Sequence, residues 1–497
     1  MYEAYKALRN FARRLNRVDA LLKMWSFFQN INHGKQLPAN FCRINKKGIP
    51  SIKDVIHPWE LDILTREVIL HSGGSKERDL YNTDHLGAAI NLIRKLTDIQ
   101  NRENLEATVL YEMQRIYQQQ AQWHVNTKLM LARYLKIYKT DCLAEVLTKG
   151  TTLTVKQFYT LGISISGHFL TNYLYNTKQD YTPFGISDEQ RDAFLEKMVF
   201  GFDDLRKRTA NVQEYNENWS YTINPLISTP LVVMDPQTPN IVICPIPFYL
   251  MSRFSEGLFF DIAKIKGYEN PYGAAFEKYV GDVSEILNDA QNYSVIKPEP
   301  YRVGKNLRHG ADWIIDDKAG AILVECKAKR LNLKARYELD FKALYGEIEV
   351  MARYVVQNYK NLDDILRGKS STQPNGDAIY PVIVTLVNWN LFGPKAFEQL
   401  EKSVSSQLEI AGLALDYVSR HPYTIMSVEE YEIALQVISQ TGIKEFFSAR
   451  DAEGHRGWMV LPFIRTKFRE EIDNCRTDYL HEEIKELQDE LAILVRV

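Results

Sequence analysis

The stretch that most constrains the fold of this chain is residues 310–330, GADWIIDDKAGAILVECKAKR. Two apolar runs flank a short polar turn, which is the pattern of a β-hairpin. Charged residues nevertheless stand where the two runs meet, because the first run opens on Asp312 and the second ends in Glu325, Cys326 and Lys327. These charges need an explanation, since the strands that carry them have the composition of buried strands.

The turn predicts how the two runs pair. If Lys318 and Ala319 form its centre, Asp312 lies directly opposite Glu325, with Cβ atoms about 4.5–5.5 Å apart. Because alternate residues of a strand share a face, Lys327 projects beside Glu325, whereas Cys326 points to the opposite, apolar face. The hairpin therefore brings three charged side chains together at one end.

Two carboxylates at that separation repel each other, and a divalent cation between them relieves the repulsion. Two protein oxygen ligands, with room left for water and phosphate, suit Mg²⁺. A metal held in this way activates water for attack on a phosphodiester, and Lys327 beside it can stabilise the transition state. The residues thus predict metal-dependent phosphodiester hydrolysis.

Asp312, then twelve residues, then Glu325-Cys326-Lys327 resembles the PD-(D/E)xK nuclease superfamily, the fold of many restriction endonucleases. The resemblance covers roughly residues 271–440, including a helix at 271–290 that places Glu277 where the family has a helical glutamate. It implies Mg²⁺, with Mn²⁺ as a substitute, and a set of site residues. Asp312 and Glu325 would be the principal metal ligands, Glu277 a direct or water-mediated ligand, the backbone carbonyl of Cys326 an extra ligand, and Lys327 the catalytic lysine.

Two features depart from the family pattern. The residue before Asp312 is Ala311 rather than proline, and the helix expected at about 337–362 lacks the Gln-x-x-x-Tyr pattern of some branches. Glu347 and Gln357 are the polar residues of that helix that could take the place of the missing pattern.

Basic residues gather around the hairpin, although the whole chain has a formal net charge of -2. A local excess of this kind fits a surface that follows the phosphates of DNA, and a solvated surface is the alternative. The residues predicted to contact nucleic acid are Lys305, Arg308, Lys329, Arg330, Lys334 and Arg336.

A chain of 497 residues predicts two or three domains. We expect a multidomain protein: an all-α domain over 1–215, a small β-containing connection over 216–270, an α/β restriction-endonuclease-like domain with a central mixed β-sheet over 271–440, and a C-terminal helical extension over 441–497. Capping boxes predict helix starts at Thr154, Ser187 and Ser427. Leucine and isoleucine recur in the last helix at Leu480, Ile484, Leu487, Leu491 and Leu494, which fits docking on the body of the protein or a homodimer contact.

The five cysteines include no CxxC pair and suit a reducing compartment. No apolar stretch is long enough to span a bilayer, so we expect a cytoplasmic protein without a membrane partner. The combined expectation is a DNA nuclease whose helical half responds to a protein or ligand trigger, an arrangement that resembles bacterial anti-phage proteins. The alternatives are a nuclease-fold module that binds nucleic acid or protein without cleavage, and a nuclease for RNA or single strands.

Overall fold

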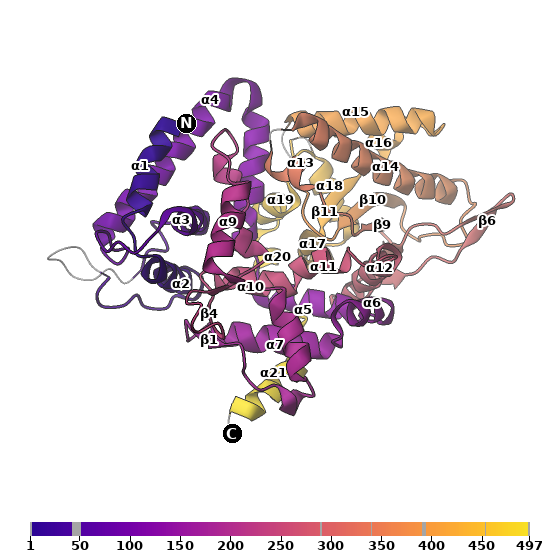
Figure 1. Ribbon diagram of the computed structural model, residues 1–497. Helices are drawn as coiled ribbons and strands as arrows, with labels where there is room; N and C mark the ends of the chain where they lie inside the picture. Colours follow the sequence, from indigo (N-terminus) through magenta and orange to yellow (C-terminus); the bar gives the residue numbers. More distant parts are fainter. Residues whose placement is uncertain are drawn as a thin grey trace. The chain divides into compact units, whose positions relative to one another are not determined.

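The computed structural model describes residues 2–41, 51–288, 291–338, 340–389, 394–452 and 454–495 (Figure 1). Cys42 therefore lies outside the described residues. The chain forms two compact units, one of Met1–Lys266 with Glu482–Val497 and one of Gly267–His481. We refer to them as unit 1 and unit 2. The expectation of a multidomain protein is confirmed, and the second unit occupies an internal stretch of the chain.

Unit 1 is mostly helical. An apolar cluster of buried residues joins α1–α4 to residues of α9, α10, β3 and β4. The predicted capping boxes at Thr154 and Ser187 are both present. The helices are α1 (Tyr2–Ala12), α2 (Arg17–His33), α3 (Pro58–His71), α4 (Thr83–Ala121), α5 (Thr127–Tyr138), α6 (Asp141–Thr151), α7 (Val155–His168), α8 (Asp188–Glu196), α9 (Phe202–Val212), α10 (Pro247–Phe254), α11 (Phe259–Ile262) and α21 (His481–Val495).

Unit 1 also contains a four-stranded sheet of order β1-β4-β3-β2. Its strands are β1 (Tyr175–Asn176), β2 (Val199–Gly201), β3 (Leu231–Val233) and β4 (Ile241–Ile243). Residues 1–215 were expected to be wholly helical, yet β1 and β2 come from this region and pair with β4 and β3. Strands of two or three residues are too short to show the alternation by which a strand is recognised in a sequence.

The last helix, α21, docks on unit 1. Glu483 accepts a hydrogen bond of 2.9 Å from Lys136 of α5, and Glu490 accepts one of 2.6 Å from Lys156 of α7. Ile484 and Leu487 are buried, as is Leu480 just before the helix, whereas the side chain of Leu494 lies outside the described residues. Three of the five stripe residues are therefore buried in the chain itself, which favours the docking interpretation.

Unit 2 is an α/β unit around a five-stranded sheet of order β11-β10-β9-β8-β5. Strands β5, β8 and β9 are antiparallel neighbours, whereas β9, β10 and β11 run parallel, so the predicted mixed sheet is confirmed. The strands are β5 (Ser294–Ile296), β8 (Trp313–Asp316), β9 (Gly320–Lys327), β10 (Ala378–Thr385) and β11 (Thr424–Ser427). A separate hairpin of β6 (Tyr301–Val303) and β7 (Asn306–Arg308) follows β5.

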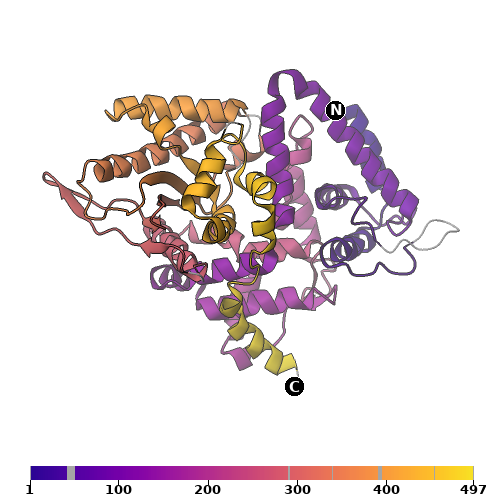
Figure 2. The same cartoon turned by 180° about the vertical axis from the view of Figure 1, so that it is seen from behind.

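Helices cover both faces of this sheet. Helices α14 and α15 lie over one face and α12 and α17 over the other, as both views show (Figures 1 and 2). The capping box at Ser427 begins α17, as predicted. The helices of unit 2 are α12 (Glu269–Ile286), α13 (Leu333–Tyr337), α14 (Phe341–Leu366), α15 (Pro394–Ile410), α16 (Tyr417–Arg420), α17 (Val428–Thr441), α18 (Ile443–Asp451), α19 (Val460–Lys467) and α20 (Arg469–Asp473).

The β8–β9 hairpin has the predicted register. Trp313 pairs with Val324, Ile314 with Leu323, Ile315 with Ile322 and Asp316 with Ala321. Lys318, at the predicted turn centre, has a positive φ of 72°, which matches the backbone of a tight hairpin turn. Asp312 immediately precedes the first of these pairs. Strands β5 and β6 are separated by Pro298 and Pro300, residues that have no N–H to donate to a strand partner.

Within the described ranges, no helix is both long enough and apolar enough to cross a membrane.

Candidate functional site

Glu325 and Lys327 stand near the C-terminal end of β9, on the face covered by α14. Glu325 is only 2% exposed, and the Nζ of Lys327 donates to its Oε1 over 2.6 Å. Two α14 residues also reach the pair. Gln357 Oε1 lies 3.4 Å from Lys327 Nζ, and Asn361 Nδ2 donates to Glu325 Oε2 over 3.4 Å. The alternation of a strand thus places both charged side chains on one face, as predicted, and α14 covers that face.

Asp312 is fixed against the same end of β9 by main-chain hydrogen bonds. Its N–H donates to the carbonyl of Val324 over 3.0 Å, and its Oδ2 accepts the N–H of Cys326 over 2.7 Å. The ammonium of Lys297 donates to the Asp312 carbonyl over 3.0 Å. The Asp312 side chain is therefore held by backbone rather than by a flexible partner.

Glu277 joins this group from α12. Its side chain is 33% exposed and forms an ion pair with Lys297, the same lysine that bonds to the Asp312 carbonyl. Its own carbonyl accepts the indole N–H of Trp313 over 2.8 Å. This bond ties α12 to the start of β8, one residue after Asp312, so the structure brings Glu277 together with the other three predicted residues.

Burial and mutual repulsion shift the protonation of the two inner carboxyl groups. Burial raises the pKa of Asp312, and the negative charge of Glu277 raises it further. Burial, followed by the charge of Asp312, raises the pKa of Glu325 to about 7. Burial alone would lower the pKa of Lys327, but the adjacent Glu325 carboxylate outweighs it and raises that pKa. Burial and mutual repulsion therefore make it unfavourable for both carboxyl groups to be ionised, and a bound cation would offset this cost.

The donor set suits a hard cation in its chemistry. Asp312 Oδ1 accepts no hydrogen bond from the described part of the chain, and Glu325 Oε2 has only the long contact to Asn361. The other carboxylate contacts are the Cys326 N–H on Asp312 Oδ2 and two ammonium groups, Lys327 on Glu325 and Lys297 on Glu277. Among the described residues no three or more His, Cys, Asp or Glu side chains are already arranged around a metal position. Asp312 and Glu325 are the two most buried carboxyl groups of the site, and they are the side chains that could hold a cation.

Cys326 occupies the other side of β9. Burial raises the pKa of its thiol well above the ordinary value, and its side chain is close enough to Tyr431 of α17 to influence the pKa of that residue. The thiol therefore lies on the face of β9 that α17 covers, opposite to the face of Glu325 and Lys327, as the alternation of the strand predicts.

The six basic residues predicted to contact nucleic acid do not form one free surface. Lys329 forms an ion pair of 2.5 Å with Glu347, and Arg308 forms an ion pair with the buried Asp364. The guanidinium of Arg336 lies 5.1 Å from the ring centre of Tyr337. Lys305, on the β6–β7 turn, and Lys334, on α13, are exposed, and Arg330 is half-buried in the loop after β9.

The residues that the sequence left undecided are now placed. Gln357 contacts Lys327, whereas Glu347 binds Lys329 and accepts a hydrogen bond of 2.8 Å from Asn332. Lys297 and Asn361 were not predicted at the site. The signal for Asn361 is its position one helical turn beyond Gln357 on α14, but nothing in the sequence around Lys297 announces its role.

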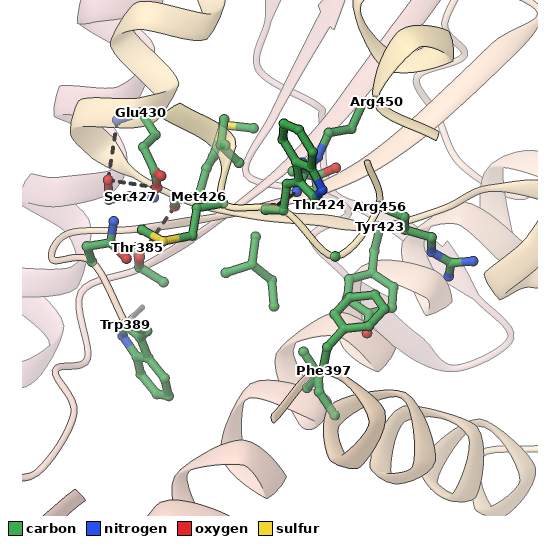
Figure 3. A pocket seen from close by; sticks show the side chains of 17 residues that line it. Thr385, Trp389, Phe397, Tyr423, Thr424, Met426, Ser427, Glu430, Arg450 and Arg456 are labelled. Carbon is green, nitrogen blue, oxygen red and sulfur yellow. Dashed lines mark hydrogen bonds between the residues drawn. The ribbon is translucent and has the colours of Figure 1, made fainter. Parts of the chain in front are cut away.

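A pocket of about 60 Å³ lies elsewhere in unit 2, at the C-terminal ends of β10 and β11 (Figure 3). Its buried carboxylate, Glu430, is used to cap α17, since Oε2 accepts the N–H of Ser427 over 2.8 Å and its hydroxyl over 3.1 Å. Its buried guanidinium, Arg450, donates to the carbonyls of His455 and Trp458. Both charged groups hold the local fold, and we assign this pocket no catalytic role.

No family model, no curated protein and no solved structure matches this chain. What the carboxylate–lysine site can do therefore rests on its own residues.

Proposed function

We propose that unit 2 is a Mg²⁺-dependent nuclease that hydrolyses the phosphodiester bonds of DNA, with a restriction-endonuclease-like PD-(D/E)xK site. One observation carries the proposal: Glu277 of α12 and Asp312, just before β8, converge with Glu325 and Lys327 at the end of β9. Buried carboxyl groups with raised pKa values beside a lysine are typical of functional sites.

Each residue of the site has a distinct role in this proposal. Asp312 and Glu325 would hold Mg²⁺, or Mn²⁺ in its place, with the carbonyl of Cys326 as a further ligand and Glu277 acting directly or through water. The metal, when bound, supplies a Lewis acid that lowers the pKa of water and offsets charge on the phosphate. Lys327, released from Glu325 and positioned by Gln357, would stabilise the negative charge that develops on the phosphate.

The proposal is tested by incubating the purified protein with plasmid, linear and single-stranded DNA and with RNA, in Mg²⁺ or in EDTA. Asp312→Asn and Lys327→Met should each reduce cleavage on the order of 10²–10³-fold. Glu277→Gln should reduce it, whereas Glu285→Gln makes the same change at an exposed position of the same helix and should leave it unaltered. Cleavage that survives both Asp312→Asn and Lys327→Met would exclude this site.

A second candidate is a nuclease-fold module that binds nucleic acid without cleaving it. The observation in its favour is that Lys327 and Lys297 form ion pairs with Glu325 and Glu277. The charges of these two carboxylates are therefore balanced without a metal ion. Titration with Mn²⁺ followed by electron paramagnetic resonance separates the two candidates. The nuclease should bind Mn²⁺ in a manner that Asp312→Asn abolishes, and the binding module should not bind it.

The anti-phage context belongs to the same proposal, with the helical unit 1 as the region that meets a protein or ligand trigger. Bacterial cells that express the wild-type chain should resist phage infection better than cells that express Asp312→Asn. Equal plaque counts across a broad phage panel would argue against this context while leaving the in vitro activity to be judged separately.

A further inference from the structure

The β6–β7 hairpin, residues Tyr301–Arg308, forms an arm that is separate from the main sheet of unit 2. Tyr301 pairs with Arg308, Arg302 with Leu307 and Val303 with Asn306, and Gly304 has a positive φ of 60° in the turn. In both views the arm extends away from the five-stranded sheet (Figures 1 and 2). Its two strands pair with each other and with no strand of the main sheet, so the arm is a two-stranded ribbon of its own.

The base of the arm is anchored to unit 2 by one of its faces. The hydroxyl of Tyr301 donates to Oδ2 of Asp364 over 2.9 Å, and Arg308 forms an ion pair with the same carboxylate. Asp364 is only 1% exposed, so this attachment is partly buried. The hydroxyl of Ser371 also donates to the carbonyl of Glu299 over 2.7 Å, just before the arm begins. Arg308, predicted to contact phosphate, is therefore better described as an anchor.

The opposite face and the tip of the arm are solvent-facing. Cross-strand partners share a face of a sheet, so Arg302 and Leu307 project together, on the side away from the Tyr301–Arg308 pair. Leu307 is 57% exposed, and Arg302 and the tip residue Lys305 are exposed as well. Neither cation has an ion pair or side-chain hydrogen bond with the described part of the chain, and residues 300–311 contain no Asp or Glu.

We propose that this arm binds double-stranded DNA by laying its Arg302–Leu307 face and its Lys305 tip into a groove. A two-stranded ribbon fits the major groove of B-DNA, where guanidinium and aliphatic side chains contact base edges and thymine methyl groups. Lys305 at the tip can contact phosphate. The choice of duplex over single strand rests on residue type, because single-strand binding uses aromatic stacking platforms and residues 302–309 include no Phe, Tyr or Trp.

The arm is followed in the chain by the candidate active site. Its role in binding the substrate therefore rests on the proposed nuclease function. Asp312 follows Arg308 by four residues, a span of at most about 14 Å. A duplex held by the arm would therefore place a strand near the carboxylates. The arm selects the form of the substrate, and the carboxylates act on it.

The test measures DNA binding in EDTA, where cleavage cannot contribute. Fluorescence anisotropy follows a random-sequence 30-base-pair duplex, and the corresponding single strand, across a salt series. Arg302→Glu/Lys305→Glu should weaken duplex binding at least about tenfold and, because Lys305 is the phosphate contact, reduce the slope of log affinity against log salt by about one. The control, Lys444→Glu/Lys467→Glu, reverses two exposed charges on α18 and α19 and should change duplex affinity less than twofold. Unchanged thermal unfolding establishes that both variants fold.

The outcomes separate this inference from the nuclease proposal. Arm-dependent duplex binding by a protein that cleaves nothing would support the arm and count against the nuclease. If the wild type cleaves DNA and the arm variant binds and cuts duplex equally well, the arm proposal is wrong and the nuclease proposal stands. Equal losses for duplex and single strand, or no duplex binding by the wild type, would also overturn the arm proposal.

Discussion

At the scale of single residues, Gly281 decides how closely α12 approaches the sheet. A Cβ at this position would lie 2.1 Å from Cζ2 of Trp313, whose indole N–H holds the carbonyl of Glu277. The missing side chain thus permits the contact that sets Glu277 beside Asp312. Gly273, on the same helix, has no atom within 4 Å of the Cβ it lacks.

These two glycines give a matched pair of substitutions. Gly281→Ala should lower the free energy of unfolding by about 1–3 kcal/mol, since it overpacks a buried contact. Gly273→Ala should raise it by about 0.5–1 kcal/mol, since alanine favours a helix interior. Urea unfolding followed by circular dichroism measures both. Equal effects from the two substitutions would contradict the packing role given to Gly281.

The charge state of His71 should influence how the stability of unit 1 depends on pH. Its Nε2 lies 2.6 Å from the hydroxyl of Tyr5, which donates to the buried Glu67 over 2.6 Å. Burial, with smaller contributions from Arg13, Arg9 and Arg206, lowers the pKa of His71 to about 4. The ring therefore stays neutral in the folded protein well below the pH at which it is protonated in the unfolded chain.

The sign of the effect follows from this difference. Above about pH 6.5 the ring is neutral in both states and contributes no pH dependence. Between about pH 6.5 and pH 4 the unfolded chain takes up a proton that the folded protein does not, so His71 should reduce stability by about 2–3 kcal/mol over that range. Asp62, whose pKa burial raises to about 6, acts in the opposite direction. The effect of His71 is therefore measured as a difference between wild type and His71→Gln in the slope of the free energy of unfolding against pH. Identical slopes for the two proteins would contradict the effect.

At the scale of elements, the β8–β9 hairpin was predictable because two independent regularities agree. The alternation of residues 311–327 and the turn around Lys318 specify the same register, and strand geometry then separates Lys327 from Cys326. Capping boxes were predictable for a similar reason, since both partners lie within one helical turn. Elements whose signals span a few adjacent residues were thus accessible from the sequence.

Contacts between distant elements were not accessible in this way. Lys297 lies 20 residues from Glu277, and Arg308 lies 56 residues from Asp364, so nothing local links the partners. The lysine that neutralises Glu277 and the anchor of the arm both depend on how the elements fold together. The six basic residues were predicted as one DNA-binding surface for the same reason. A sequence shows where the positive charges are, but not that Arg308 and Lys329 are already paired with carboxylates.

At the scale of the whole molecule, the C-terminal helix α21 belongs to unit 1 although unit 2 precedes it in the chain. Removing residues 482–495 should destabilise unit 1, because each buried aliphatic side chain such as Ile484 or Leu487 contributes about 1.5–3 kcal/mol. Hydrogen exchange should rise in α5 and α7 and stay unchanged in β9 and β10. Lys156→Ala is the control and should have little effect, since surface ion pairs contribute little. Faster exchange in β9 would contradict the assignment of α21 to unit 1.

The order of these segments has a consequence for biosynthesis. A ribosome completes Gly267–His481 before it adds the residues of α21, so the segment bearing the carboxylates is available to fold first. Unit 1 acquires its last helix only when translation has reached the end of this stretch. The helical unit therefore reaches its final form late, and every chain in which it is complete already carries the whole of unit 2.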